Sequence, residues 1–168
     1  YVHAHSPRAI RTVAVAAVAE RYAARSQDPD LLLALLRGRF DAVSAEYQSG
    51  ALAEEAAKQE IGEIFYKAGW ALERLGRRSE AVREYQNALQ SLPNDPILLH
   101  KAGDLAWRLG RAEEHRAHLE RVAALARDPH EAANALYQMG LIAQTVLADE
   151  ARAALDFERA LAAMPTFT

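Results

Sequence analysis

The sequence contains no cysteine. Disulfides and thiolate metal sites are therefore excluded, and the cellular compartment is left open, with the cytoplasm favoured over the periplasm or secretion. Long apolar runs are missing as well. The longest, at about residues 9–19, is interrupted by Arg11 and is shorter than the roughly 20 residues that a membrane span needs. We therefore expect no insertion into a membrane.

The chain also lacks a strong charge of one sign. Its formal net charge is −3 at pH 7, which gives no bulk attraction to nucleic acid or to an anionic membrane. Nucleic acid is accordingly not an expected partner. Alternating runs of Val, Ile, Thr and aromatic residues are missing, so no strand is predicted. Alanine, leucine, glutamate and arginine dominate, which favours helix nearly throughout and an all-α fold.

The six prolines act as boundaries between helices. Asp28-Pro29, Asp95-Pro96 and Asp128-Pro129 each place a capping side chain before a proline in the first helical position. Pro93 and Pro165 follow helical runs and end them. Links of two to four residues make consecutive helices antiparallel neighbours. This pattern predicts about nine helices, at 7–26, 29–37, 40–49, 51–75, 78–91, 96–109, 112–127, 129–147 and 149–163.

The chain repeats itself. The segment AGWALERLG at 68–76 returns as AGDLAWRLG at 102–110, with five of nine letters shared. A second series consists of a small residue, an aromatic residue, a small residue and a proline, and it also occurs twice. Its two copies are Ala81, Tyr85, Ala88 and Pro93, and Ala153, Phe157, Ala160 and Pro165. Self-similarity at a fixed period indicates stacked helix pairs, because one pair alone cannot bury its apolar face.

On these residues the chain resembles the tetratricopeptide repeat (TPR) family, in which each repeat of about 34 residues forms two antiparallel helices. The resemblance implies a right-handed α-solenoid and three repeats within 62–168, at 62–95, 96–132 and 133–166. The first repeat matches the family pattern fully, and the third matches after one extra residue in its turn. The second keeps Gly103 but has His115, Leu119 and Val122 where the family expects a small, an aromatic and a small residue.

Residues 1–61 form a less regular N-terminal helical region. The segment 35–48 resembles the turn and second helix of a degenerate repeat, with Gly38 in place of Gly76 and Tyr47 in place of Tyr85. The preceding helix, 7–26, carries an apolar stripe and is predicted to cover the end of the stack as a cap. Because the chain begins with Tyr1 rather than Met, we expect a fragment or a processed form.

The last predicted helix carries Leu155, Phe157 and Leu161, and no polar-faced helix follows it. Repeat arrays usually end in such a helix. We therefore expect either that the native protein continues, or that this C-terminal end pairs with another copy in a homo-oligomer.

Signatures of catalysis are missing. There is no glycine-rich phosphate loop, no G-x-S-x-G and no H-E-x-x-H, so the chain is not predicted to be an enzyme. His115 and His118 share a helix face beside Glu114, where a metal ion is conceivable. Without further ligands at suitable spacing, a solvated or packed pair of histidines is the favoured interpretation, and no metal or cofactor is predicted.

The resemblance implies where a partner would bind. In the family the first helix of each pair lines a concave groove, and helical spacing keeps the inward positions on one stripe. These positions hold the candidate partner-binding residues, which are Tyr66, Trp70, Glu73, Arg74, His100, Asp104, Trp107, Arg108, Tyr137, Leu141 and Gln144. Aromatic residues with polar neighbours are typical of binding hot spots.

Two features qualify this groove. One family subclass clamps a C-terminal carboxylate with Lys and Asn, but here the matching positions are Tyr66 and Trp70, then His100 and Asp104. This groove is better suited to apolar anchors of a peptide, with an acidic group held by the arginines. Alternatively, the N-terminal helix or the helix at 51–75 fills the groove and the aromatic residues are core.

The leading hypothesis is a non-catalytic scaffold that binds a protein or peptide in the groove. A self-assembling module is the first alternative. An accessory domain of a larger enzyme, with its catalytic part outside this sequence, is the second.

Overall fold

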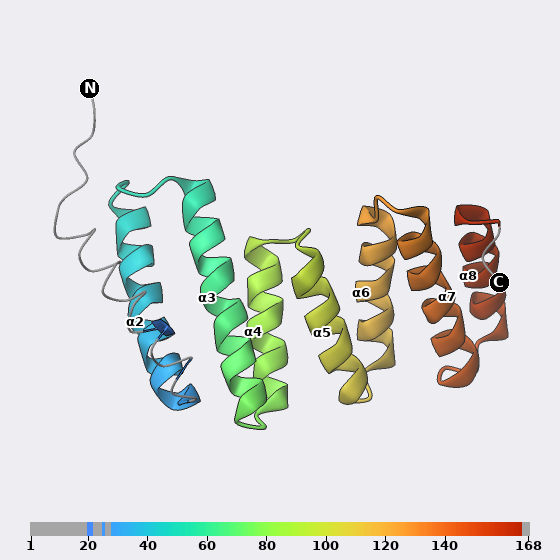
Figure 1. Cartoon of the computed structure of the whole chain (residues 1–168), viewed down its shortest axis with the longest axis horizontal. Coiled ribbons are helices and arrows are strands. Elements are labelled where there is room, and N and C mark those ends of the chain that lie inside the picture. The colour runs from blue at the N-terminus through green and yellow to red at the C-terminus, as the bar shows by residue number, and fades with distance from the viewer. Residues whose placement is uncertain (1–19, 22–24, 26–27, 166–168) are drawn as a thin grey trace. The chain divides into compact units, whose positions relative to one another are not determined.

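The computed structural model describes residues 20, 21, 25 and 28–165. Within these residues every regular element is a helix, and no strand occurs. The seven helices are α2 (Pro29–Gln48), α3 (Glu54–Arg74), α4 (Arg78–Ser91), α5 (Pro96–Arg108), α6 (Ala112–Leu125), α7 (Pro129–Thr145) and α8 (Glu150–Ala163) (Figure 1). In the described part of the chain, no helix is both long enough and apolar enough to cross a bilayer.

The chain divides into two compact units. Unit 1 comprises residues 1–92 and contains α2, α3 and α4, whereas unit 2 comprises residues 93–168 and contains α5 to α8. The predicted boundary at residue 61 lies inside α3, and the assignment of 1–61 and 62–168 to separate regions stays a prediction. The right-handed solenoid likewise stays a prediction.

The predicted helix starts are confirmed where aspartate precedes proline. Asp28, Asp95 and Asp128 each accept a hydrogen bond of 3.0 Å from a backbone N–H in the first turn of α2, α5 and α7. Asp149 caps α8 in the same way without a following proline. These caps satisfy N–H groups that have no partner inside the helix.

The prediction of two helices at 29–37 and 40–49 is wrong, because α2 is continuous from Pro29 to Gln48. Gly38 lies inside this helix and does not take the place of the turn glycine Gly76, so the degenerate turn proposed for 35–48 is also wrong. A glycine in a helix costs only about 1 kcal/mol. Leu32, Leu36 and Val43 are buried on both sides of it, and their packing outweighs that cost. The predicted helix at 7–26 lies outside the described residues except for residues 20, 21 and 25.

The true turns contain glycines in the left-handed region. Gly76 has φ of 74°, and the N–H of Arg77 donates to the carbonyl of Leu72 at 2.9 Å, which closes the end of α3. Gly110 ends α5 in the same way, with φ of 72°. The corresponding turn after α7 is one residue longer and uses Ala148, with φ of 52°. The extra turn residue predicted for the third repeat is therefore confirmed.

Replacing Gly38 by alanine is expected to stabilise the protein by about 1 kcal/mol, because alanine is the better helix former and an added Cβ meets no atom within 4 Å. A urea titration followed by circular dichroism measures the change. Gly76→Ala is the matched control, because its positive φ penalises any Cβ by roughly 1–2 kcal/mol. Stabilisation by both substitutions, or by neither, would contradict the assignment of Gly38 to a helix interior and Gly76 to a turn.

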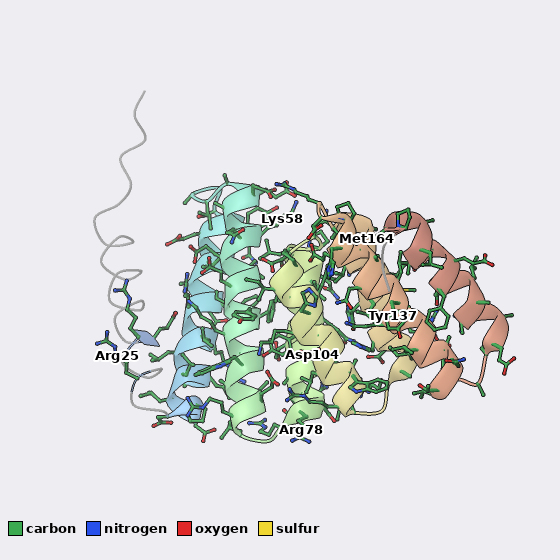
Figure 2. All side chains as sticks on the ribbon, turned by 45° about the vertical axis from the view of Figure 1, so that its right-hand side comes forward. Arg25, Lys58, Arg78, Asp104, Tyr137 and Met164 are labelled. Carbon is green, nitrogen blue, oxygen red and sulfur yellow. The ribbon has the colours of Figure 1, made fainter. Side chains whose placement is uncertain are left out.

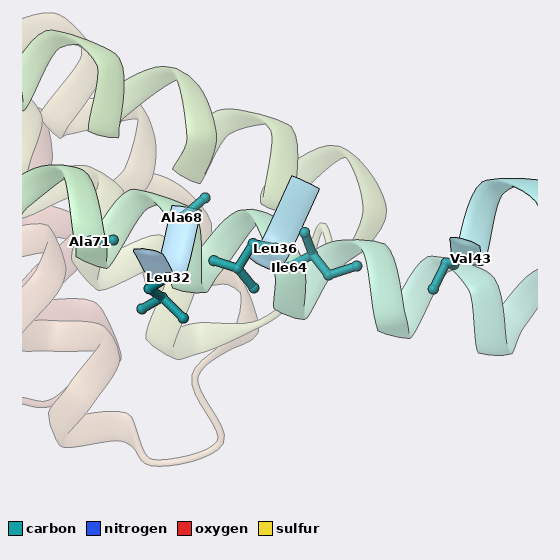
Figure 3. Packing of buried hydrophobic residues seen from close by; sticks show 6 residues of the cluster. All are labelled: Leu32, Leu36, Val43, Ile64, Ala68 and Ala71. Atoms are coloured by element: carbon teal, nitrogen blue, oxygen red, sulfur yellow. The ribbon is translucent and has the colours of Figure 1, made fainter. Parts of the chain in front are cut away.

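The core of unit 1 lies between α2 and α3. Figure 3 shows its buried side chains facing one another from the two helices, and they are Leu32, Leu36, Val43, Ile64, Ala68 and Ala71. Phe40 and Phe65 pack at the edge of this cluster with ring centres 5.5 Å apart. Unit 1 therefore buries α2 against the first helix of the first predicted repeat.

A ring packed against a glycine holds α3 to α4. An ideal Cβ added to Gly69 would lie 2.6 Å from a ring carbon of Tyr85, so only glycine fits. Tyr85 is fully buried, and its hydroxyl donates to Glu73 at 2.6 Å. In unit 2, Gly140 and Phe157 repeat this contact between α7 and α8, at 2.5 Å. The small and aromatic positions of the repeat thus have the packing roles that the sequence predicts.

An arginine joins three helices of unit 2. Arg116 of α6 donates to the carbonyl of Met139 in α7 at 2.7 Å and to the carboxylate of Asp156 in α8 at 2.6 Å. The side chains of Arg116 and Asp156 are only 8% and 3% exposed. Two exposed ion pairs, from Arg152 to Glu113 and from Arg159 to Glu120, also link α8 to α6. None of the sequence patterns described above indicated a role for Arg116.

Candidate functional site

In unit 1, most of the candidate groove residues take part in packing. Tyr66 is half-buried, with its ring centre 5.9 Å from that of Tyr85. Trp70 packs against the core cluster between α2 and α3. Glu73 accepts the hydrogen bond from the Tyr85 hydroxyl, and burial together with this bond raises the pKa of Tyr85. These three residues therefore support the helix pair.

Arg74 is the exposed member of the candidate set in unit 1. Its guanidinium lies 5.0 Å from the centre of a Trp70 ring, which is a cation–π distance. The nearby Arg77 forms two hydrogen bonds of 2.7 Å to Glu80, so a carboxylate already neutralises part of this basic turn.

The space beside Trp70 is partly lined by residues that precede the first predicted repeat. A hollow of about 310 Å³ there has Glu20, Leu32, Arg39 and Lys67 in its walls. Glu20 is buried and accepts hydrogen bonds from Arg39 at 3.0 Å and from Lys67 at 3.3 Å. Residues that precede the first predicted repeat therefore share this hollow with Trp70.

In unit 2, the candidate residues of α5 are exposed. His100, Asp104 and Arg108 all face solvent, and Trp107 is 45% exposed. The inner part of the Trp107 side chain contacts α6, where the ring of His115 lies 5.6 Å away. Much of the indole remains available to a partner.

The candidate residues of α7 are exposed as well. Tyr137 is 41% exposed and leans on Phe157, with ring centres 5.4 Å apart. Leu141 and Gln144 follow it along the same helix, and both are exposed. Figure 2 shows the Tyr137 side chain on α7 and the Asp104 side chain on α5, the two helices that also contribute to a cavity in unit 2.

A cavity of about 170 Å³ lies between α5, α6 and α7. Side chains of Leu99, Leu119 and Val122 give it an apolar wall. Polar side chains complete the lining, and they are His100, Asp104, His115, His118, Glu131, Asn134 and Gln138. The cavity opens among exposed residues of the predicted groove, since His100, Asp104 and Asn134 are exposed.

His115 and His118 point their imidazoles into this region. Burial is the main cause that lowers the pKa of both side chains, which favours the neutral imidazole. Neither Nδ1 atom has a hydrogen-bond partner among the described residues. No group of three or more potential metal ligands occurs among the residues that the structure describes. Both histidines are half-buried and line the cavity.

The resemblance to known proteins lies in the fold. No protein-family model and no curated protein sequence matches the chain. Among solved structures, a MamA RS-1 ArsTM double mutant has 19% identity and a TM-score of 0.57, over 96% of this chain and 78% of that one. Another MamA structure has 14% identity and a TM-score of 0.51, over 92% of each chain. YrrB, described as a TPR protein with an unusual peptide-binding site, has 17% identity and a TM-score of 0.47, over 88% of this chain and 84% of its own. The likeness to MamA, a TPR protein, shows that this chain has a TPR-like fold.

Proposed function

We propose that this chain is a non-catalytic interaction module and that the exposed candidate residues of unit 2 bind a peptide segment of a partner protein. The observation that carries the proposal is the exposure of Trp107 and Tyr137 on α5 and α7. The same two helices bury other large apolar residues, such as Leu99, Leu105 and Met139. Large aromatic side chains left partly exposed beside polar groups are typical of binding hot spots.

Unit 1 contributes fewer exposed candidate residues to the proposed binding site. Tyr66, Trp70 and Glu73 stabilise the helix pair, so among its candidates Arg74 is the one offered to a ligand. Arg74 and Arg108 occupy equivalent positions in successive predicted repeats, and each is suited to an acidic group of a peptide.

Replacing Trp107 and Tyr137 together by alanine is expected to weaken peptide binding at least tenfold, because hot-spot aromatics commonly contribute more than 1 kcal/mol each. The peptide is selected from a random display library on the wild-type chain, and its dissociation constant is measured by fluorescence anisotropy. Trp107 and Tyr137 are 45% and 41% exposed and neither is among the buried core residues, so the helical content should stay unchanged.

Leu155→Ala with Leu161→Ala is the matched control, since both leucines are exposed on α8, which carries none of the candidate residues. This control should retain wild-type affinity. An equal loss in the control, or no loss in the aromatic double variant, would overturn the proposed site. A library that yields no binding peptide would count against the function itself.

The exposed leucines of α8 support a second function, self-association. Leu155 and Leu161 are more than half exposed, and exposed apolar residues on one helix are a usual feature of homo-oligomer contacts. Size-exclusion chromatography with light scattering tests this. A monomer at high concentration, or an oligomer that persists in the leucine double variant, would exclude it.

A further inference from the structure

The cavity of unit 2 lies beside Gly103, at the glycine position that the other helix pairs cover with an aromatic ring. In the pairs α3–α4 and α7–α8, the helix glycine is covered by the ring of Tyr85 or Phe157. In the pair α5–α6, the same repeat position holds Leu119. Gly103 is instead approached by Nδ1 of His115, at 3.1 Å from an ideal Cβ. The chain thus replaces a large aromatic side chain by a smaller aliphatic one at this position.

The space that results is large enough for one aromatic ring. The cavity volume is about 170 Å³, and an engineered protein cavity of about 150 Å³ is known to hold benzene. Gly103, His115, His118 and Leu119 all line it, so it lies directly beside the glycine. Its apolar wall suits the faces of a ring.

The polar side chains of the lining need a hydrogen-bonding group on the ligand in addition to an apolar ring. Nδ1 of His118 is buried and has no hydrogen-bond partner among the described residues. Nδ1 of His115 is also buried without a partner of good hydrogen-bond geometry, although its imidazole interacts with the backbone of Gly103. A neutral imidazole has one donor and one acceptor nitrogen. A hydroxyl group both donates and accepts, so it can satisfy either nitrogen whichever one carries the proton. Asp104 and Glu131 at the cavity add acceptors and disfavour an anionic ligand.

We propose that this cavity binds the phenol ring of a tyrosine in the partner peptide, with the tyrosine hydroxyl hydrogen-bonded to His115 or His118. The inference rests on the proposed function and adds to it an anchor that the candidate residues did not include. Tyr85 and Phe157 cover the helix glycine in the other pairs, whereas His115 and His118 contact Gly103 here, so the inserted ring would lie beside these two histidines. The exposed His100, Asp104 and Asn134 border the entrance and connect the anchor with the candidate groove.

The test uses p-cresol, which is the tyrosine side chain alone, with toluene as the ring without the hydroxyl. Imidazole resonances of His115 and His118 are followed by NMR on the full chain as each probe is added. We expect saturable shifts with p-cresol and an affinity for toluene about tenfold weaker, which corresponds to one hydrogen bond. No saturable shift with p-cresol, or equal binding of toluene, would overturn the assignment to tyrosine.

Two filling variants locate the probe. Leu119→Phe restores the aromatic residue of the repeat, and Ala135→Leu fills the cavity from α7. Either variant, once its helical content is verified by circular dichroism, should weaken p-cresol binding at least tenfold. Wild-type binding of p-cresol in a folded filling variant would place the probe elsewhere and contradict the proposal. The comparison of p-cresol with toluene uses the wild-type chain alone, so it still tests the proposed tyrosine site if both filling variants fail to fold.

The failure of the anchor and the failure of the proposed function are distinguishable. If the selected peptide binds through Trp107 and Tyr137 but is unaffected by Leu119→Phe, the anchor is wrong and the function stands. If p-cresol binds the cavity but no peptide can be selected, the cavity is a ring site without the proposed function, and the anchor as a partner contact is refuted.

Discussion

Replacing Asp156 by alanine is expected to lower the free energy of unfolding by about 3–5 kcal/mol, the usual cost of leaving a buried charge without its partner. The Arg116 guanidinium would retain the carbonyl of Met139 and the exposed Glu113, 3.9 Å away, but lose the buried carboxylate that lies 2.6 Å away. Because the Arg116 side chain is 8% exposed, water cannot fully replace that carboxylate. A urea titration followed by circular dichroism measures the loss.

Glu113→Ala is the matched control. It removes an ion pair between the same two helices, α6 and α8, in which Glu113 accepts from Arg152 at 2.8 Å. Glu113 also lies 3.9 Å from Arg116, but its removal leaves the buried pair of Arg116 and Asp156 in place. These side chains are 59% and 48% exposed, so we expect a loss below about 1 kcal/mol. Comparable losses in the two variants would show that Arg116 and Asp156 are not the buried pair described.

The second large loss of stability is expected for Tyr85→Leu. This substitution gives the pair α3–α4 the residue type that the pair α5–α6 has at the same repeat position, where Leu119 stands. The smaller side chain would leave a cavity beside Gly69 and remove the hydroxyl that donates a hydrogen bond to Glu73. Truncating a buried aromatic residue and leaving a carboxylate without its donor together are expected to cost about 3 kcal/mol. The same urea titration measures this value.

Tyr85→Phe separates the two contributions, since it keeps the ring and removes the hydroxyl alone. The third pair already has Phe157 at this position, so the ring is sufficient for packing. We expect a loss of about 1–1.5 kcal/mol from the hydrogen bond. If Tyr85→Phe were as destabilising as Tyr85→Leu, the contact with Gly69 would contribute little and the packing argument would fail.

The helix boundaries were predictable from residues whose effects are local. The Asp-Pro caps at 28, 95 and 128 and the glycine turns at 76 and 110 act within a few residues, so the sequence indicates them directly. The prediction of a helix end at Gly38 was wrong because the sequence alone does not distinguish a glycine that ends a helix from a glycine that packing keeps inside a helix. The contacts of Leu36 and Val43 that decide the matter are tertiary.

The candidate site was predictable only as a stripe. Helical spacing predicts inward positions for Trp70 and Trp107 in successive repeats, but it does not indicate that Trp70 packs against the core cluster of α2 and α3 whereas Trp107 stays 45% exposed. The cavity had a sequence signal, namely the replacement of the aromatic position by Leu119. That Leu119 indicates a cavity could be recognised only from the structure, which shows the histidines beside Gly103 and their buried Nδ1 atoms.

The buried position of Arg116 had no comparable signal. An arginine in a helix that also carries Glu113 and Glu120 has the sequence pattern of a solvated helix face. Its partner Asp156 is 40 residues away in the chain, and only the packing of α6 against α7 and of α7 against α8 brings the two side chains together.

Each compact unit contains one tryptophan, Trp70 in unit 1 and Trp107 in unit 2, and the chain has no other. A variant with phenylalanine at one of these positions therefore emits indole fluorescence from a single, known unit. Comparing the unfolding transitions of the two variants shows directly whether the units unfold together or in succession. The fluorescence of the remaining tryptophan would then assign a measured change in stability to unit 1 or to unit 2.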